Sequence, residues 1–520
     1  MNLCFSSEPP QWILGNRSTQ VRLALPLFGI AGTRTIEQAA QAELPPHALM
    51  QQAGLSVARL SLALAPHAQT IWLACGPGNN GGDGLEAAMH LRQWGKTPVV
   101  TWLGDPDHAP EDAKSSWQRA VGAGVAFSVK PPEKFDFCID ALLGLGASVI
   151  SMSDPRTGRA HDGRMASWIA TLNAGHAPVL AVDVPTGLNV KTGQAGTPCV
   201  QADHTLSLVT LKPGLFTGDG RDASGEIWLD TLGTVCLYLP DAWLAASPMQ
   251  SEHRHASHKG SFGDVAVVGG ATGMTGAALL AASAALHGGA GRVFVTLLDH
   301  AAMAVDHSQP ELMFRRIDAL DLAALTVVCG CGGGASMAEP LSNLLASAAL
   351  AVVDADALNA IAADRQLRAV LAARAAKGQQ TILTPHPLEA ARLLATTASQ
   401  VQQNRLQAAA QLANEIGCTV VLKGSGTVIA APGQVPVINP TGNARLATAG
   451  TGDVLAGLVG ARMAALSGKG GAGGSARAAQ VFRAACDAVY LHGQMADQWP
   501  GGTVLTASGL ARSFGRNAAE

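Results

Sequence analysis

Short apolar runs alternate with helical patterns along most of the chain. Each run ends at a Gly, Asp or Pro that marks a turn, and a helical stretch follows the turn. This alternation is typical of βαβ units, so it predicts parallel sheets that are covered by helices on both faces. Ligands of such sheets bind at the carboxyl ends of the strands, which is where the motifs described below lie. The predicted strands are Thr70–Cys75, Pro98–Leu103, Phe135–Leu143, Pro178–Val184, Asp264–Gly269, Arg292–Leu297, Leu325–Cys329, Ala349–Val353, Gln380–Leu383 and Thr419–Leu422.

One polar segment interrupts the alternation and predicts a division into two domains. It begins at Ala245, is rich in Ser and His, and has neither helical nor strand periodicity, so we interpret residues 245–257 as a linker. The 520 residues then comprise an N-terminal extension of residues 1–28, a first domain of residues 29–244 and a second domain of residues 258–520.

The composition is that of a folded protein from a reducing compartment. Hydrophobic residues make up 48% and charged residues 14% of the chain, which provides enough apolar side chains for large cores. A net charge of −3 and an aromatic content of 4% argue against nucleic acid as a partner. No apolar run reaches the ~18 residues of a membrane span, and Cys329 and Cys331 lack the second pair that a zinc site needs. We expect a cytoplasmic protein with no membrane partner; a homo-oligomer is compatible with the sequence.

The segment after the first predicted strand, Gly76–Gly84, is rich in glycine and in side-chain oxygens. It leads into a helix that we predict from Leu85. Glycines let the backbone approach a ligand closely, and N–H groups at a helix start bind phosphate. Asn79, Asn80 and Asp83 add oxygen atoms. The alternative is a tight strand–helix turn that binds nothing.

Two further strand ends in this half carry carboxylates. Asp140 precedes the glycine loop Gly144–Gly146, and Asp183 is followed by Val-Pro-Thr-Gly. A carboxylate that ends an apolar strand is partly desolvated and suits proton transfer. Oxygen ligands from converging strand ends also suit an alkali or alkaline-earth cation. The alternatives are a structural turn at Asp140 and a helix N-cap at Asp183.

In the second half, Gly450-Thr451-Gly452-Asp453 precedes a helix that we predict from Val454. Backbone N–H groups and the helix dipole would hold a phosphate there. A carboxylate is not a phosphate ligand, so Asp453 is better suited to orient or deprotonate a hydroxyl that is about to be phosphorylated. The chain contains no Walker A sequence. The alternative is a capping box without chemistry.

Three other strand ends in this half carry polar side chains. The segment Lys423–Thr427 links two predicted strands, and its lysine could reach nucleotide phosphates or stand solvated in a hairpin. His386 lies between two prolines, which should hold its ring rigidly toward a ligand. Asp354 and Asp356 could hold Mg²⁺ or cap the next helix.

The first half resembles the NAD(P)H-hydrate epimerase (YjeF N-terminal) family from about Gly29 to Trp243. The motifs that carry the resemblance are Ala48–Gly54, Gly78–Gly84, Asp140 with Leu143-Gly144, and Asp183 with Pro185-Thr186-Gly187. The resemblance implies epimerisation of NADH and NADPH hydrated at C6 of the nicotinamide ring, with Asp183 catalytic. The implied substrate-binding residues are Asn79, Asn80, Gly81, Gly82, Asp83, Gly144, Leu145, Gly146, Ala147, Ser148 and Asp183, and the implied potassium ligands are Asn80, Asp140 and Thr186.

The second half resembles the ADP-dependent NAD(P)H-hydrate dehydratase (YjeF C-terminal) family, which is ribokinase-like, from Lys259 to about Leu510. The motifs that carry this resemblance are Gly269-Gly270, Thr275–Ala278, Gly330–Gly334, Thr384–Pro387, Lys423–Thr427, Asn439–Asn443 and Gly450–Asp453. The implied hydrate-binding residues are Ala277, Gly332, His386 and Asp453, the last also catalytic. The implied nucleotide-binding residues are Lys423, Gly424, Ser425, Gly426, Thr427 and Gly452, with ADP or ATP as co-substrate and Mg²⁺ as its ion.

The sequence departs from the family patterns at three positions. Thr186 stands where the epimerases usually have Ser, and its hydroxyl can still bind a cation. Leu145 replaces a usual Thr and removes a hydroxyl. In the second half, Cys331 replaces the proline of Gly-Pro-Gly-Leu-Gly, while the surrounding glycines should preserve the shape of the loop.

The two resemblances together imply an α/β protein with two three-layer αβα domains, one Rossmann-like and one ribokinase-like, joined by a short linker. The first would interconvert R and S hydrates, and the second would dehydrate the S form to NAD(P)H, giving AMP and phosphate if ADP is the donor. Two other functions stay open. One is a small-molecule kinase of the hydroxymethylpyrimidine or hydroxyethylthiazole type, and the other is a first half that serves as a non-catalytic binding scaffold.

Overall fold

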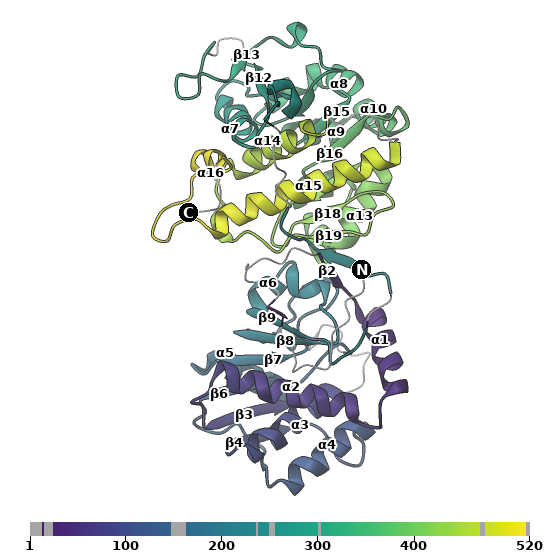
Figure 1. Ribbon diagram of the computed structural model, residues 1–520, viewed down its shortest axis with the longest axis vertical. Coiled ribbons are helices and arrows are strands. Elements are labelled where there is room, and N and C mark those ends of the chain that lie inside the picture. Colours follow the sequence, from purple (N-terminus) through teal and green to yellow (C-terminus); the bar gives the residue numbers. More distant parts are fainter. Residues whose placement is uncertain are drawn as a thin grey trace. The chain divides into compact units, whose positions relative to one another are not determined.

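The computed structural model describes residues 13–14, 24–146, 163–235, 238–248, 255–299, 303–467 and 474–515. The chain divides into two compact units. The N-terminal unit comprises Met1–Thr19 and Pro26–Ala242, and the C-terminal unit comprises Gln20–Leu25 and Trp243–Glu520. Each unit contains a sheet with helices on its faces (Figure 1).

The division falls between Ala242 and Trp243, shortly before the segment 245–257 that we predicted to be a linker. The amide of Ala245 donates to the carbonyl of Ile438 at 2.9 Å, so the start of that segment continues strand pairing. Residues 249–254 lie outside the described part of the chain.

The sheet of the N-terminal unit has the strand order β1-β9-β8-β7-β6-β3-β4-β5. All pairs are parallel except β1 with β9. Its strands are β1 (Ile13–Leu14), β3 (Thr70–Cys75), β4 (Thr97–Trp102), β5 (Ala126–Ser128), β6 (Phe137–Ala141), β7 (Val179–Val182), β8 (His204–Leu208) and β9 (Glu226–Asp230). Its α-helices are α1 (Ile30–Glu43), α2 (Ala48–Leu64), α3 (Asn79–Gln93), α4 (Glu111–Gly122), α5 (Gly163–Ala174) and α6 (Gly220–Ala223).

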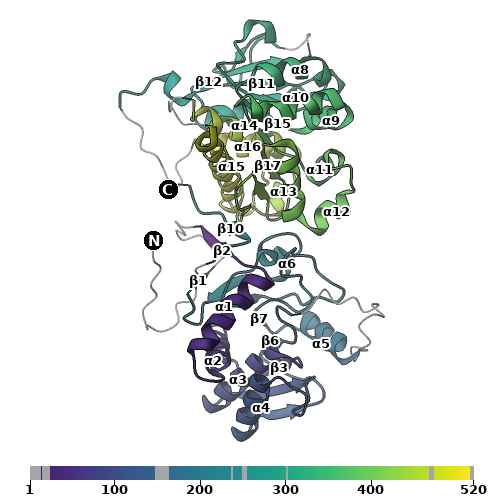
Figure 2. The same cartoon turned by 90° about the vertical axis from the view of Figure 1, so that its right-hand side faces the viewer.

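Successive residues of β3 point to opposite faces of this sheet. Ile71 and Leu73 pack in the core formed with α2, α3 and α4, whereas Trp72 and Ala74 pack in the core formed with α5. Figure 2 shows α5 on the side of the strands away from α3 and α4. The unit is therefore a three-layer αβα structure.

The sheet of the C-terminal unit has the order β13-β12-β11-β14-β15-β16-β17-β18-β19-β10-β2. Pairing is parallel from β13 to β17, and β18 is antiparallel to both its neighbours. Its strands are β11 (Asp264–Gly269), β12 (Arg292–Leu297), β13 (Met313–Phe314), β14 (Thr326–Cys329), β15 (Leu350–Val353), β16 (Gln380–Leu383), β17 (Thr419–Leu422), β18 (Val428–Ala430) and β19 (Val437–Ile438), followed by β10 (Ala242–Leu244) and β2 (Leu25–Leu27), in which the chain passes from one unit to the other.

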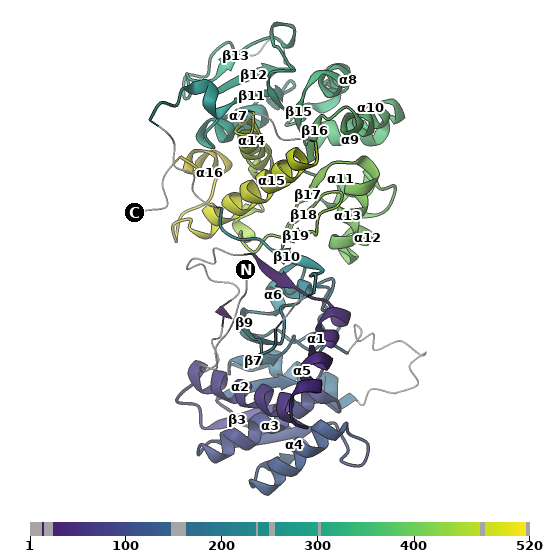
Figure 3. The same ribbon diagram turned by 45° about the vertical axis from the view of Figure 1, so that its right-hand side comes forward.

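Two groups of helices sandwich this sheet (Figure 3). Val327 and Val353 pack with helices α8 to α13, and Val328 and Val352 pack with α7, α14 and α15. The helices are α7 (Thr275–His287), α8 (Ala338–Ser347), α9 (Ala355–Ala363), α10 (Arg365–Ala376), α11 (Pro387–Leu393), α12 (Ala398–Gln403), α13 (Arg405–Ile416), α14 (Thr451–Ala464), α15 (Gly474–Asp497) and α16 (Ala507–Ser513). The predicted pair of αβα domains is thus confirmed.

All the predicted strands are present, with ends that differ from the predicted ones by at most two residues. The strands that the sequence analysis missed include β8, in which apolar and polar residues alternate, and β9, in which only Ile227, Trp228 and Leu229 are apolar. It also placed two helix starts too late. The helix predicted from Leu85 begins at Asn79, and the helix predicted from Val454 begins at Thr451. Among the described residues, no helix is both long and apolar enough to cross a membrane.

Candidate active sites

In the N-terminal unit, the neighbouring strands β3 and β6 lead the chain in opposite directions along the sheet, toward β4 and β7. A ligand crevice is expected at the carboxyl ends of such a pair. The loops after the two strands meet there, since the amide of Gly76 donates to the carbonyl of Ala141 at 2.9 Å. A Cβ atom on Gly76 would overlap the carbonyl oxygen of Leu142, so only glycine permits this contact.

The glycines of the Gly76–Gly84 segment are largely explained by packing. A Cβ atom on Gly81 would overlap the carbonyl oxygen of Gly76, and one on Gly84 would lie 2.6 Å from Cβ of Ala141. The start of α3 is therefore pressed against the crevice, with Asn79 as its first residue. A tight strand–helix turn is therefore present between Cys75 and Asn79, and ligand binding by this segment stays a prediction.

The three predicted potassium ligands lie around the end of β6. Thr186 donates its amide and its hydroxyl to the two carboxylate oxygens of Asp140, at 2.8 and 2.7 Å. Asp140 is fully buried, and this burial raises its pKa to about 6. The side chain of Asn80 lies against Gly144, and its buried Nδ2 has no hydrogen-bond partner among the described residues. Such hard oxygen donors around a buried carboxylate fit a monovalent cation.

Asp140 also shapes the loop that follows β6, because its Oδ1 accepts a hydrogen bond from the amide of Leu142 at 3.2 Å. The structural turn that we considered for Asp140 is therefore present. It leaves the candidate ligand role open, since a carboxylate oxygen can accept more than one interaction.

Asp183 forms a buried ion pair at the end of β7. Its Oδ1 accepts hydrogen bonds from Nζ of Lys212 and from the amide of Leu208. The backbone of Asp183 has φ of 68°, a left-handed conformation that non-glycine residues adopt rarely and that is often found at functional sites. None of the described helices begins directly after Asp183, so the N-cap alternative is wrong.

Two more carboxyl groups interact with Asp183, namely Asp83 of α3 and Glu37 of α1. Burial raises the pKa of Asp83 well above its ordinary value, and the negative charges of Asp183 and Glu37 raise it further. Burial likewise raises the pKa of Glu37, and Asp183 adds to this shift. Two carboxyl groups with raised pKa values thus lie near a carboxylate that an ammonium binds, an arrangement that suits acid–base chemistry.

The other predicted residues of this site lie at the same edge of the sheet or outside the described residues. Gly82 is buried in α3, and Gly144, Leu145 and Gly146 follow β6. Ala147 and Ser148 lie outside the described residues. The sequence analysis did not identify Lys212 or Glu37. The available signal for Lys212 was a lone lysine inside the apolar stretch Leu211–Phe216.

In the C-terminal unit, β11 and β14 form the equivalent pair of strands, because they lead toward β12 and β15. The amide of Gly270 donates to the carbonyl of Cys331 at 2.9 Å, and a Cβ atom on Gly269 would overlap that same carbonyl oxygen. Gly332 has φ of 58°. A Cβ atom there would lie 2.8 Å from Cβ of Ala277, so two of the predicted hydrate-binding residues are neighbours.

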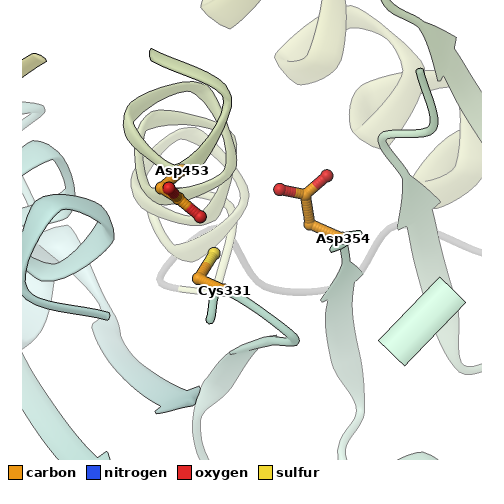
Figure 4. Close-up of side chains that lie close together, drawn as sticks. All are labelled: Cys331, Asp354 and Asp453. Carbon is orange, nitrogen blue, oxygen red and sulfur yellow. The ribbon is translucent and has the colours of Figure 1, made fainter. Parts of the chain in front are cut away.

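Asp453 lies close to Cys331 and Asp354 near the carboxyl ends of β14 and β15 (Figure 4). Each of the three side chains offers one atom that could bind a metal ion, and these atoms lie within 4.8 Å of one another. Burial raises the pKa of Asp453 to about 6, with a contribution from the charge of Asp354, whereas a hydrogen bond with the Cys331 thiol lowers it. The N-cap of α14 is Gly450, which has no side chain to form a capping box. The capping alternative is therefore wrong.

Lys423 lies between two carboxyl groups in the same crevice. Its Nζ is 2.7 Å from Oδ1 of Asp354 and 4.0 Å from Oε2 of Glu389. The hydroxyl of Thr384 donates to the same Asp354 oxygen at 2.7 Å. The Lys423 side chain is only 18% exposed, so the alternative of a solvated lysine is wrong.

Asp354 and Asp356, which we could assign to Mg²⁺ or to capping, do not cap α9 with their side chains. Asp354 occupies the N-cap position, but its side chain accepts no hydrogen bond from the helix. Asp356 lies in the first turn and accepts a hydrogen bond from the amide of Gly334 at 2.8 Å. Both carboxylates thus connect the end of β15 to neighbouring loops.

The ring of His386 is fixed at the start of α11. Its Nδ1 accepts hydrogen bonds from the amides of Leu388 and Glu389, at 3.1 and 3.3 Å. The ring proton therefore resides on Nε2, which lies 3.2 Å from Oε1 of Glu389. The other oxygen of Glu389 accepts the amide of His386 at 2.8 Å. Glu389 is buried, and this burial raises its pKa to about 7.

The Lys423–Thr427 turn rests on the buried guanidinium of Arg405. This group donates to the carbonyls of Leu422 and Lys423 at 3.1 and 3.2 Å. Gly424 has φ of 139°, and a Cβ atom there would lie 2.8 Å from the guanidinium. A Cβ atom on Gly452 would lie 3.5 Å from Nζ of Lys423, so the predicted nucleotide-binding turn and the start of α14 meet at this lysine. Ser425 and Gly426 lie within the turn, and the Thr427 hydroxyl closes it by donating to the carbonyl of Gly424 at 3.0 Å.

The sequence analysis missed three residues of this site. The sequence signal for Glu389 was an acidic residue directly after His386-Pro-Leu. Arg405 lies in a polar stretch that gives no such signal. His492 of α15 is buried, and its Nε2 lies 2.9 Å from the carbonyl oxygen of Thr451. Burial lowers its pKa to about 4. Arg405 and His492 contact their partners from a distance in sequence that no local motif spans.

Two family models match the chain in the same order as the two units. The model described as YjeF-related protein N-terminus matches residues 46–214, and the model described as NAD(P)H-hydrate dehydratase matches residues 265–512. The two matches thus define a chain that combines a YjeF-related domain with an NAD(P)H-hydrate dehydratase domain.

Relatives with this combination cover most of the chain. The bifunctional NAD(P)H-hydrate repair enzyme Nnr of Escherichia coli (strain K12) is 32% identical over 472 residues, which cover 86% of this chain and 84% of that protein. The bifunctional NAD(P)H-hydrate repair enzyme of Leishmania braziliensis is 34% identical over 528 residues, which cover 91% and 89%. The chain belongs to the family of bifunctional NAD(P)H-hydrate repair enzymes. Among solved structures, the ADP/ATP-dependent NAD(P)H-hydrate dehydratase of Bacillus subtilis is 27% identical, with a TM-score of 0.39 and coverage of 51% of this chain and 91% of that one.

Proposed function

We propose that the N-terminal unit interconverts the R and S hydrates of NADH and NADPH at Asp183, and that the C-terminal unit dehydrates the S hydrate at Asp453 with ADP or ATP. The observation that carries the proposal is the position of the two carboxylates. Each lies with other titratable groups beside a pair of strands that lead in opposite directions, where α/β sheets bind ligands.

Epimerisation at C6 needs a base and an acid. The hydroxyl and the ring nitrogen share this carbon, so removal of the hydroxyl proton can form a C=O bond while the C6–N1 bond breaks and N1 takes the electron pair. We assign the base to Asp183 and the proton delivered to N1 to Asp83, whose pKa burial raises. Reversal of these steps on the other face of the aldehyde gives the other epimer.

Potassium is the cation that we assign to the Asp140 site. Asp140, Thr186 and Asn80 would hold it, and the charge of the ion would stabilise the buried Asp140 carboxylate. The hydrogen bonds between Thr186 and Asp140 and the unpartnered Nδ2 of Asn80 support this assignment, because a small reorientation of the amide would bring its oxygen to the ion.

Dehydration needs a better leaving group than hydroxide. In our proposal, Asp453 accepts the hydroxyl proton while the hydroxyl oxygen bonds to the terminal phosphorus and the nucleotide departs as AMP or ADP. Phosphate then leaves C6 with the electron pair of the C–O bond, and loss of a C5 proton forms the ring double bond. The positive charge of Lys423, which lies beside Gly452, would stabilise the phosphates.

Mg²⁺ is assigned to the nucleotide phosphates rather than to a protein cage. Oδ1 of Asp354 already binds the Lys423 ammonium, and Oδ2 of Asp356 accepts a backbone amide. Mg²⁺ commonly keeps several waters and binds through substrate phosphates with few carboxylates. Asp354 and Asp356 would therefore contact its waters.

The test uses the full chain with a mixture of R and S NADPH hydrate, Mg²⁺ and either ADP or ATP, and follows the absorbance of regenerated NADPH. We expect complete conversion of both epimers, and conversion of the S form alone after Asp183→Asn. Accumulation of a stable phosphorylated hydrate would favour a small-molecule kinase. Failure of the wild-type chain to consume the R form would favour a non-catalytic scaffold. Replacement of K⁺ by tetramethylammonium should slow only the consumption of the R form.

A further inference from the structure

Lys212 is a fully buried lysine in the N-terminal unit whose ammonium meets three acceptors. Its Nζ donates to Asp183, to the hydroxyl of Ser207 at 3.1 Å and to the carbonyl of Leu208 at 2.8 Å. An ammonium has three hydrogens, so these contacts satisfy it completely. A buried charge of this kind is costly unless it is paired, and its only described partner of opposite charge is Asp183.

An ammonium has no free electron pair, so Lys212 cannot be a base in this state, and its three hydrogens are all bound inside the protein. Its side chain is also 0% exposed, whereas that of Asp183 is 10% exposed. Asp183 is thus the member of the pair that can reach a ligand. Any effect of Lys212 on a ligand must pass through Asp183 or through the local backbone.

The other charged groups near Asp183 make this ammonium more important. The charge of Asp183 raises the pKa values of both Asp83 and Glu37, and Arg34 lowers that of Glu37. Asp112 and Glu86 add negative charge near Asp83. Glu86 is already paired with Arg119 at 2.8 Å and Asp112 with His47 at 2.6 Å. Without Lys212, the Asp183 carboxylate would lose its ammonium partner in a cluster that holds two further carboxyl groups.

We propose that Lys212 is a positioning residue for epimerisation: its ammonium holds Asp183 in the ionised state and in the orientation in which the carboxylate accepts the hydroxyl proton of the hydrate. The inference rests on the role of Asp183 proposed above. It assigns to Lys212 no contact with the substrate and no proton transfer.

The left-handed backbone of Asp183 supports this positioning role. A non-glycine residue at φ of 68° is strained and persists only where its surroundings hold it. The carboxylate is held by Lys212 and the Leu208 amide, and the Asp183 amide donates to the carbonyl of Leu206 at 2.7 Å. These contacts fix both ends of the residue.

The test is the pH profile of epimerisation in the full chain, with Lys212→Met, Lys212→Arg and the matched control Lys191→Met. Lys191 is exposed in the same unit, so its replacement should change nothing. Dehydration of the S hydrate by the other unit reports whether each variant chain is intact. In Lys212→Met, the acid limb of the epimerisation profile should move to higher pH by at least one unit, with a drop of 10-fold or more at neutral pH. Lys212→Arg should retain the wild-type limb.

A double variant separates positioning from folding. If Lys212 acts through Asp183, then Lys212→Met should slow the wild-type chain but should not slow Asp183→Asn any further. Should Lys212→Met fail to fold, Lys212→Arg combined with Ser207→Ala provides a milder change that should move the same limb in the same direction. A folded Lys212→Met chain with the wild-type profile would overturn the inference while leaving Asp183 as the base. An Asp183→Asn chain that epimerises normally would instead overturn the proposed function.

Discussion

Nζ of Lys423 and Oδ1 of Asp354 lie 2.7 Å apart, although 69 residues separate them in sequence. The pair connects the turn after β17 to the end of β15 inside the C-terminal crevice. Asp354 is fully buried and its side chain shares the contact with the hydroxyl of Thr384. This pairing makes the geometry of the crevice depend on a single ammonium.

Lys423→Met should therefore weaken both the fold and the site of the C-terminal unit. Removal of one partner leaves the Asp354 carboxylate buried without its cation, and such losses typically cost about 3–5 kcal/mol. Chemical denaturation should show a lower midpoint for this unit, and calorimetry should show weaker ADP and ATP binding. Lys377→Met is the matched control, since Lys377 is exposed at the end of α10. Equal midpoints for the two variants would contradict the role of the pair.

Asp453→Asn should abolish nucleotide-dependent dehydration while leaving nucleotide binding intact or tighter. The amide keeps the shape of the side chain but accepts no proton, and loss of a general base commonly costs about 10²–10⁴-fold in rate. The amide is also uncharged, so it does not repel the phosphates as the Asp453 carboxylate does. Calorimetric ADP binding and the rate of NADPH recovery from the S hydrate measure the two effects. Near-normal turnover would refute the assigned role, and loss of binding as well would indicate a structural one.

Dehydration should depend on pH through Asp453, whose pKa burial raises to about 6. The carboxylate must be ionised to accept a proton, so the rate should be constant well above pH 6 and fall as the pH drops through 6. The Cys331 thiol lowers this pKa, so Cys331→Ala should move the acid limb to higher pH. Cys418→Ala removes another buried thiol and should leave the limb in place. Coincident limbs for all three proteins would exclude Asp453 as the titrating group.

Gly76→Ala should disable the epimerase alone. A Cβ atom on Gly76 would overlap the carbonyl of Leu142, so the loops after β3 and β6 must separate and the Asp140 site with them. Gly78→Ala is the control two residues away, because a Cβ atom there meets nothing within 4 Å. We expect consumption of the R hydrate to be lost in the first variant and kept in the second, with dehydration of the S hydrate intact in both. A Gly76→Ala chain that epimerises normally would show that the two loops are not coupled.

Periodicity was sufficient to predict the strands and the layers of both units. Strands such as β3 and β15 are continuous apolar runs because they are buried on both faces, and such runs stand out in a sequence. The carboxyl ends of β6, β7 and β15 carry Asp140, Asp183 and Asp354, so the candidate sites could be predicted as well. The strands β8 and β9 were missed because they lack such runs.

The partners of these carboxylates could not be predicted from local pattern. Lys212 meets Asp183 from 29 residues away, and Glu389 approaches Lys423 only because β16 and β17 are neighbours. Contacts of this kind follow from strand order, which periodicity does not encode. The helix starts were placed too late for a related reason. Glycines such as Gly81 and Gly84 weaken a helix by propensity, but close packing against Gly76 and Ala141 requires them.

The backbone angle of Asp183 restricts how this position can change during evolution. At φ of 68°, glycine and asparagine are the residues that fit with least strain, and neither can accept a proton from a hydroxyl. Replacements that are mildest for folding are thus the ones that end the chemistry. In a saturation library at this codon, variants selected for accumulation should be enriched in Gly and Asn, while those selected for use of the R hydrate should retain Asp alone. Chains that drift away from epimerase activity therefore have an easy route that leaves the rest of the molecule, including its second activity, undisturbed.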